Sequence, residues 1–85
     1  MKTIRNASIH LIIDKTDKDY GGSLTLPRNI LIHSKILEYE QVHIECGSNR
    51  WVTYVLSGDC VCVNGAGARL CLPGDEILVT TYEIV

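Results

Sequence analysis

The run from Tyr20 to Leu37 reads YGGSLTLPRNILIHSKIL and carries three local structural signals in succession. Gly21-Gly22 favours a turn, because glycine adopts positive φ angles at little cost. Ser23 to Leu26 is predicted to form a short strand. Pro27 suits the first turn of a helix, and a helical spacing follows it at Ile30, Leu31, Ser34 and Leu37. This stretch therefore predicts a turn, a strand and one short helix.

The rest of the chain has the pattern of a small β protein. Turn signals recur at Gly47-Ser48-Asn49, Ser57-Gly58-Asp59, Asn64-Gly65 and Pro73-Gly74-Asp75. Val42, Ile44 and Cys46 alternate with polar residues, as on a strand with one buried face. We expect strands at about Thr3 to Ile13, Ser23 to Leu26, Gln41 to Cys46, Arg50 to Leu56, Cys60 to Val63 and Glu76 to Ile84. Short strands without a long exposed edge indicate a small β-barrel.

Composition restricts the class of protein and its partners. The 85 residues allow one small domain, residues 1–85, with an aliphatic core, because 46% of them are hydrophobic but only one is Trp and none is Phe. The net charge of −2 gives no general attraction to nucleic acid or to an anionic membrane. Residues 1–13 contain Lys2, Arg5 and His10 and lack the apolar core of a signal peptide, so we expect a cytoplasmic protein.

The cysteines at positions 46, 60, 62 and 71 leave two interpretations open. Without a secretory signal, reduced thiols are favoured over a disulfide framework. Cys60 and Cys62 are two apart in a β-like run, so they face the same side and would begin a metal site only if Cys71 and another ligand converged there. The commoner role of cysteine as a small buried hydrophobic residue is favoured, and no metal is assigned.

The Gly22-Ser23 peptide bond is the main candidate for chemistry. If the Ser23 hydroxyl attacks the Gly22 carbonyl, the amide becomes an ester, and β-elimination then cuts the chain and leaves a pyruvoyl group. Such a ketone condenses with a primary amine and accepts the electrons released when carbon dioxide leaves an α-carboxylate. A flexible turn is the alternative role of Gly-Gly-Ser, so the case depends on the surrounding motifs.

Those motifs occur in a specific order along most of the 85 residues. Tyr20-Gly21-Gly22-Ser23 is followed by Ile36-Leu37-Glu38, Arg50-Trp51-Val52-Thr53-Tyr54, Val63-Asn64-Gly65-Ala66-Gly67-Ala68 and Gly74-Asp75-Glu76-Ile77-Leu78-Val79. In this order the chain resembles the pyruvoyl-dependent aspartate 1-decarboxylases. The resemblance implies a six- or seven-stranded double-psi β-barrel with one short helix, a homotetramer with active sites between subunits, and self-cleavage between Gly22 and Ser23. It also implies a place in pantothenate biosynthesis.

The resemblance assigns roles to individual residues. Arg50 would bind the substrate carboxylate, since guanidinium makes bidentate carboxylate contacts, although a solvated turn arginine is its alternative role. Thr53 would hydrogen-bond the Gly22 carbonyl as it becomes an oxyanion. Tyr54 would return the proton after decarboxylation, and Tyr20 would line the site. The covalent cofactor would be the pyruvoyl group derived from Ser23.

The run Asn64-Gly65-Ala66-Gly67 has two interpretations. Its backbone carries little side-chain bulk, so its N–H groups can approach an anion such as a substrate carboxylate. A plain hairpin turn is the alternative, because Asn-Gly is the strongest two-residue hairpin signal.

The sequence leaves open whether Thr53 and Tyr54 can reach the same site. Adjacent strand residues point to opposite faces unless a bulge redirects one.

Two departures from the family pattern leave the substrate open. The family carries a lysine two residues before the histidine that matches His10, whereas this sequence has Ser8 there. The sequence also reaches Val85 soon after the Gly74-Asp75 strand, so it resembles a shortened member. The leading reaction is L-aspartate to β-alanine and carbon dioxide. Action on another small amino acid, a barrel without turnover and dependence on a maturation partner remain alternatives.

A second resemblance belongs to a different functional class. Gly22 to Ile30, followed by Ile36-Leu37-Glu38 and a β segment, is also similar to swapped-hairpin DNA-binding antitoxins and regulators. Such proteins cluster Lys and Arg for phosphate contacts. Here the eight basic residues are scattered and outnumbered by ten acidic ones, and Arg50 to Val79 is left unexplained. The sequence therefore favours the enzyme, with a small amino acid as its ligand and no nucleic acid or membrane partner.

Overall fold

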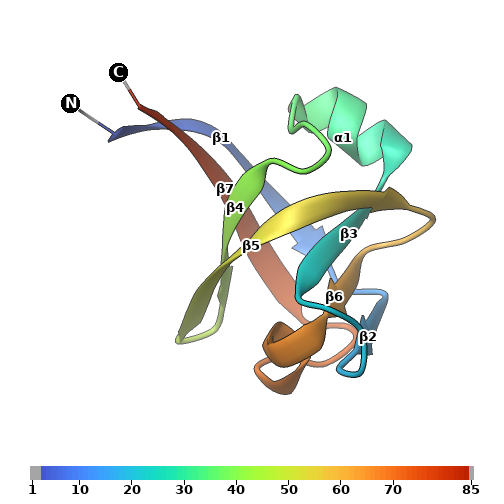
Figure 1. The fold of residues 1–85 in the computed structure, drawn as a ribbon. Coiled ribbons are helices and arrows are strands. Elements are labelled where there is room, and N and C mark those ends of the chain that lie inside the picture. The colour runs from blue at the N-terminus through green and yellow to red at the C-terminus, as the bar shows by residue number, and fades with distance from the viewer. Residues whose placement is uncertain (1–2, 85) are drawn as a thin grey trace.

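Seven strands, one α-helix and one 3-10 helix follow one another in residues 3–84, which the computed structural model describes (Figure 1). The strands and helices, in chain order, are β1 Thr3–Ile12, β2 Lys15–Asp17, β3 Ser23–Pro27, α1 Arg28–Ser34, β4 Gln41–Cys46, β5 Asn49–Gly58, β6 Cys62–Asn64, the 3-10 helix Gly65–Arg69 and β7 Glu76–Ile84. No helix among these residues has the length and apolar character needed to cross a membrane.

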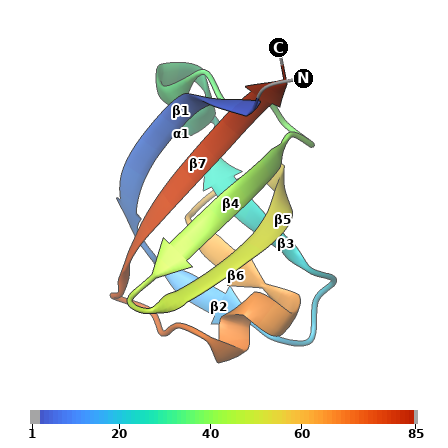
Figure 2. The same ribbon diagram turned by 90° about the vertical axis from the view of Figure 1, so that its left-hand side faces the viewer.

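All seven strands belong to one curled sheet in the order β1-β7-β4-β5-β3-β6-β2. Most neighbouring strands are antiparallel, but β3 runs parallel to β5 and β2 runs parallel to β6. Figure 2 shows β3 lying behind β4 and β5, so the sheet curls back over its own inner face. This arrangement confirms the prediction of a mainly β fold with one short helix and is consistent with a double-psi β-barrel.

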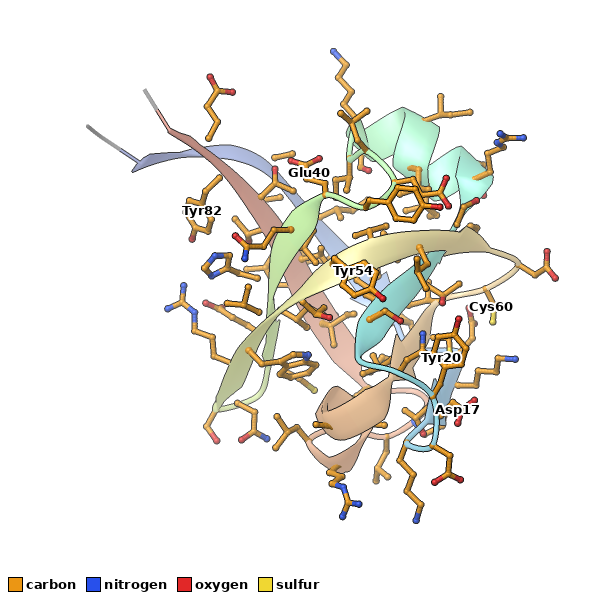
Figure 3. The ribbon with its side chains drawn as sticks, in the orientation of Figure 1. Asp17, Tyr20, Glu40, Tyr54, Cys60 and Tyr82 are labelled. Atoms are coloured by element: carbon orange, nitrogen blue, oxygen red, sulfur yellow. The ribbon has the colours of Figure 1, made fainter. Side chains whose placement is uncertain are left out.

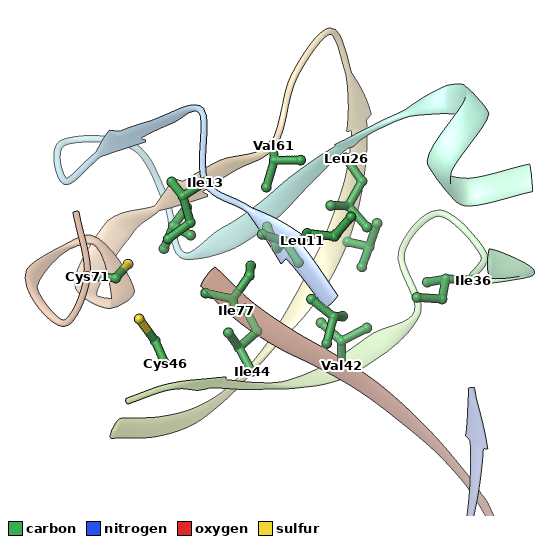
Figure 4. Close-up of a cluster of buried hydrophobic side chains, with 14 of the residues drawn as sticks. Leu11, Ile13, Leu26, Ile36, Val42, Ile44, Cys46, Val61, Cys71 and Ile77 are labelled. Carbon is green, nitrogen blue, oxygen red and sulfur yellow. The ribbon is translucent and has the colours of Figure 1, made fainter. Parts of the chain in front are cut away.

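The inner face of the curled sheet holds an aliphatic core, as the composition predicts. Figure 4 shows these side chains meeting between the strands. The fully buried aliphatic residues include Leu24 and Leu26 from β3, Val42 and Ile44 from β4, Val55 from β5, Val63 from β6, and Ile77 and Val79 from β7. In each strand that contributes two of these residues, the two are separated by one position. The alternation seen in the sequence therefore matches the alternation of buried side chains in the structure.

The helix α1 is shorter than the sequence predicts, because the helical spacing extends to Leu37 but the helix ends at Ser34. It begins after Pro27, as expected, but ends at Ser34, and Lys35 adopts a left-handed conformation with φ 63°. Because a left-handed residue terminates an α-helix, Leu37 lies outside it and its side chain is 71% exposed. Leu37 therefore does not continue the buried side of the helix, which is formed by Leu31.

Three local elements differ from the sequence prediction. Strand β2 was not expected, because its three residues carry no apolar alternation and it forms only by parallel pairing with β6. Strand β6 begins at Cys62 rather than Cys60. After Asn64 the chain enters the 3-10 helix and not a two-residue hairpin turn, which removes one of the two interpretations of this run.

Candidate functional site

Ser23 is the first residue of β3, and its side chain is held by a buried hydrogen-bond network. The residue is 1% exposed and lies opposite Asn64 in the antiparallel pairing of β3 with β6. Its Oγ donates to the Gly21 carbonyl oxygen at 3.3 Å and accepts from Asn64 Nδ2 at 2.9 Å. The predicted nucleophile is therefore fixed beside the Gly22-Ser23 peptide bond.

The amide of Asn64 connects Ser23 to two further side chains. Its Nδ2 also donates to Thr25 Oγ1 at 3.0 Å, and its Oδ1 accepts from the Cys62 thiol at 3.1 Å. Thr25 and Cys62 had no role in the sequence prediction. A signal for both was present, because Thr25 follows Ser23 by two residues and Cys62 precedes Asn64 by two, and such positions face the same side of a strand.

Gly22 lies against the first turn of the 3-10 helix, and Gly65 makes this contact possible. A Cβ atom at Gly65 would lie 2.6 Å from Gly22 Cα and 2.8 Å from Gly22 N, and Gly65 has φ +75°. Glycine is thus required for both its conformation and its lack of a side chain. Gly67 has a similar role two residues later, where a Cβ would lie 2.6 Å from the Trp51 indole nitrogen.

We expect Gly65→Ala to lower the free energy of unfolding by about 2–5 kcal/mol, from left-handed strain combined with a backbone clash. Gly47→Ala is the matched control, since Gly47 has φ +60° but a Cβ there would meet nothing within 4 Å. That variant should lose only about 1–2 kcal/mol. Urea denaturation of the uncleaved variants measures both values. Equal losses would show that Gly22 moves aside freely and that the close approach has no structural importance.

A cavity of about 420 Å³ opens beside Gly22, between β5 and the 3-10 helix. Thr53 lies in its wall, together with Gly22 and Asn64. The other lining residues are Trp51, Val52, Ala66, Gly67, Arg69 and Leu70. The structure therefore brings Gly22, Thr53 and the Asn64–Gly67 run together from three separate segments of the chain.

A second cavity, of about 290 Å³, lies on the other side of Asn64. It is lined by Lys15 and Asp17 of β2, Tyr20, Thr25, Asp59, Cys60, Cys62 and Asn64. Figure 3 shows Tyr20 near Asp17 and Cys60, with which it shares this cavity. Tyr20 thus shares a cavity with Asn64, which hydrogen-bonds Ser23. It does not line the other cavity, which contains Thr53.

Arg50 and Tyr54 do not line the cavity beside Gly22. Along β5, Trp51, Thr53 and Val55 face inward, whereas Arg50, Val52 and Tyr54 are exposed. Arg50 Nε lies 3.5 Å from Glu45 Oε1 across the β4–β5 pair, and the Tyr54 residue is 43% exposed. Strand alternation thus separates Thr53 from Tyr54 within one chain, since no register shift interrupts the β4–β5 pairing there.

The thiols of the described residues are all free. Cys46, Cys62 and Cys71 are buried and Cys60 is half-buried, and residues 3–84 contain no group of three or more potential metal ligands. Burial is the main cause that raises the pKa of Cys46, Cys62 and Cys71, the last to about 11. These three thiols are therefore protonated at neutral pH.

The N-terminal strand β1 carries Ser8, which replaces the family's lysine, and His10, which matches the family's histidine. Ser8 lies on β1 opposite Thr80, and His10 Nδ1 lies 3.2 Å from Glu76 Oε1 in an exposed pair with β7. Neither residue lines the cavities beside Gly22 and Asn64. Lys15, by contrast, lines the second cavity, together with the carboxylates of Asp17 and Asp59.

The sequence matches the profile of the aspartate decarboxylase family over residues 1–85. It is 38% identical to a protein named aspartate 1-decarboxylase from Dehalococcoides mccartyi strain CBDB1, over 79% of this chain and 59% of that protein. A protein of the same name from Clostridium acetobutylicum is 39% identical over 80% of this chain and 58% of its own length. That from Acetivibrio thermocellus is 35% identical over 96% of this chain and 71% of its own length. The chain thus spans about three fifths of the first two relatives.

Proposed function

This chain belongs to the aspartate decarboxylase family, and on that premise we propose that it is a self-processing amino-acid α-decarboxylase that converts L-aspartate to β-alanine and carbon dioxide. The observation that carries the proposal is the placement of Ser23. Its buried hydroxyl is held by Asn64 at 2.9 Å, next to the glycine whose carbonyl it would attack. A serine in a merely flexible turn would have no need of this buried network.

The proposed self-cleavage uses groups that lie around Gly22 and Ser23. Ser23 Oγ attacks the Gly22 carbonyl carbon, and the acyl group moves from the Ser23 nitrogen to Oγ. Thr53 donates to the Gly22 oxygen while it carries negative charge, a role supported by their shared cavity. Loss of the Ser23 α-proton to solvent base then breaks the Cβ–Oγ bond and releases Gly22 as a carboxylate. Water displaces ammonia from the remaining residue and leaves the pyruvoyl group.

The surroundings of residue 23 fit a small ketone at the new terminus. When formed, the pyruvoyl group supplies the electron sink for loss of carbon dioxide. Ala66 and Gly67 add little bulk to the cavity beside Gly22, which leaves room there for a small ketone. Backbone N–H groups of Gly65, Ala66 and Gly67 are proposed to bind a substrate carboxylate in this cavity.

The exposed face of β5 supports a site shared between copies of the chain. Arg50 is proposed to bind the substrate carboxylate and Tyr54 to return the proton at the α-carbon, with Tyr20 lining the site. Because Arg50 and Tyr54 face away from their own chain's Thr53, a second copy must bring its β5 face to the cavity for all of them to act together. A homotetramer provides such contacts, and the proposal includes it.

Decarboxylation of L-aspartate by the incubated protein, measured as β-alanine and carbon dioxide in equal amounts, tests the activity. Arg50→Ala should raise KM by about tenfold to a hundredfold with a smaller change in kcat, because it removes a charge-assisted carboxylate contact. Arg50→Lys should recover only part of this loss, since an ammonium cannot make a bidentate contact. Arg28→Ala, at the exposed start of α1, is the control and should match wild type.

The same assay separates the alternatives for the substrate. Turnover of another small amino acid in preference to aspartate, the alternative that Ser8 in place of the family's lysine leaves open, would retain the decarboxylase and reject aspartate as its substrate. Absence of turnover with every amino acid, in protein that has been fully cleaved, would contradict the enzymatic proposal. An unchanged KM in Arg50→Ala would remove Arg50 from substrate binding.

A further inference from the structure

The side-chain amide of Asn64 can adopt two orientations that exchange its oxygen and nitrogen, and the orientation determines how Ser23 is hydrogen-bonded. Two hydroxyl groups, Ser23 Oγ and Thr25 Oγ1, lie on one side of the amide, and hydroxyls can either donate or accept. With Nδ2 toward them, Asn64 donates to both, and the Ser23 hydrogen remains free to donate to the Gly21 carbonyl. With Oδ1 toward them, Ser23 would give its hydrogen to Asn64 and lose that contact.

Cys62 decides between these orientations. Its thiol lies on the opposite side of the amide, with Sγ 3.1 Å from Asn64 Oδ1, and both residues are buried. A protonated thiol donates well enough to an amide oxygen but accepts poorly from an amide nitrogen, so it favours Oδ1 on its own side. Both side chains come from β6, two residues apart, so the strand itself fixes their relative position.

The groups around Cys62 keep its thiol in the donating form. Burial, followed by the neighbouring Cys60, raises the pKa of this thiol above its ordinary value of 9.0; Lys15 acts in the lowering direction and Asp17 in the raising direction. A thiolate would instead accept a hydrogen bond and turn the Asn64 amide around. At neutral pH the balance favours the neutral thiol.

From this geometry we infer that Cys62 is a positioning residue for self-cleavage: its thiol orients the Asn64 amide, which in turn holds Ser23 Oγ beside the Gly22 carbonyl. The inference rests on the proposed function, because it assigns Cys62 to the cleavage step. It also applies before any cleavage, since the whole network belongs to the intact chain.

The rate of cleavage in freshly prepared protein, followed by intact mass, tests the role of Cys62. Cys62→Ala removes the donor and should slow cleavage about tenfold, the effect of one lost hydrogen bond. Cys62→Ser keeps a donor and should stay within about threefold of wild type. Cys60→Ala is the matched control, because Cys60 lines the second cavity together with Cys62 and its thiol makes no hydrogen bond among the described residues. Burial, the larger cause of the raised pKa of Cys62, remains in that variant. Cys60→Ala should therefore match wild type.

A second readout does not depend on cleavage. Exchange of the Asn64 side-chain amide hydrogens with solvent, followed by NMR in the uncleaved chain, should be at least tenfold faster in Cys62→Ala than in wild type, and near wild type in Cys62→Ser. The inference is overturned if Cys62→Ala leaves either the cleavage rate or this exchange unchanged, or if the serine variant behaves as the alanine variant does. If wild type itself is never cleaved, the proposed function fails, and the amide exchange alone decides whether Cys62 orients Asn64.

Discussion

Replacing Ser23 with alanine should leave the chain in one piece at all times and abolish decarboxylation. The alanine has no hydroxyl to attack the Gly22 carbonyl and cannot become a pyruvoyl group. Loss of the single Oγ atom therefore prevents both self-cleavage and decarboxylation. Intact mass spectrometry under denaturing conditions measures the first, with wild type giving two polypeptides, residues 1–22 and 23–85. The amino-acid decarboxylation assay measures the second.

Ser57→Ala is the control for this experiment, because Ser57 is an exposed serine on β5. It should be cleaved and active as wild type is. Cleavage between residues 22 and 23 in Ser23→Ala would contradict the proposed chemistry, since no nucleophile would remain at that position. A wild-type chain that stays intact after prolonged incubation, with or without cell extract, would also contradict it. Cleavage only with extract would instead point to a maturation partner.

Thr53→Val should slow self-cleavage by about 10² to 10³, the usual effect of removing one donor from a developing oxyanion. Valine has nearly the same shape as threonine, and Thr53 lies half-buried in the cavity wall beside Gly22, so the change removes a hydroxyl with little repacking. Thr53→Ser should restore most of the rate, because it returns the hydroxyl. The time course of intact mass measures all three proteins.

The matched control is Thr16→Val on β2, which removes a half-buried hydroxyl that does not line this cavity. Its cleavage rate should equal that of wild type. A Thr53→Val protein that is cleaved at the wild-type rate and has an unchanged melting temperature would exclude Thr53 as the oxyanion donor. The donor would then have to be sought among backbone N–H groups near Gly65 and Ala66.

The strands that the sequence predicts are those with strong local alternation. Val42, Ile44 and Cys46 are all buried on β4, because the side chains of a strand alternate whatever its partners are. Strand β2 could not be predicted from its three residues, since it exists only through pairing with β6. The end of α1 was also missed, because the left-handed conformation of Lys35 is not encoded by a glycine or proline at that position.

In the candidate site, too, some predicted residues lie together in the structure and others do not. Gly22, Ser23, Thr53 and Asn64 were selected from their chemistry and motif order, and the fold brings all of them to the cavity or the network around residue 23. The roles assigned to them stay predictions. Arg50 and Tyr54 were selected in the same way but lie on the outer face of β5, so their use depends on a second copy of the chain.

The sequence by itself determined the local elements, the aliphatic core and the chemical groups available near Gly22-Ser23, because these depend on residue type and on spacings of two to four residues. Only the tertiary structure decided that Asn64, 41 residues away, donates to Ser23, and that Gly65 closes on Gly22. Such contacts arise when β3 pairs with β6 and the sheet curls. No local pattern encodes them, since they depend on how distant strands are paired, and the buried position of the Ser23 hydroxyl is their product.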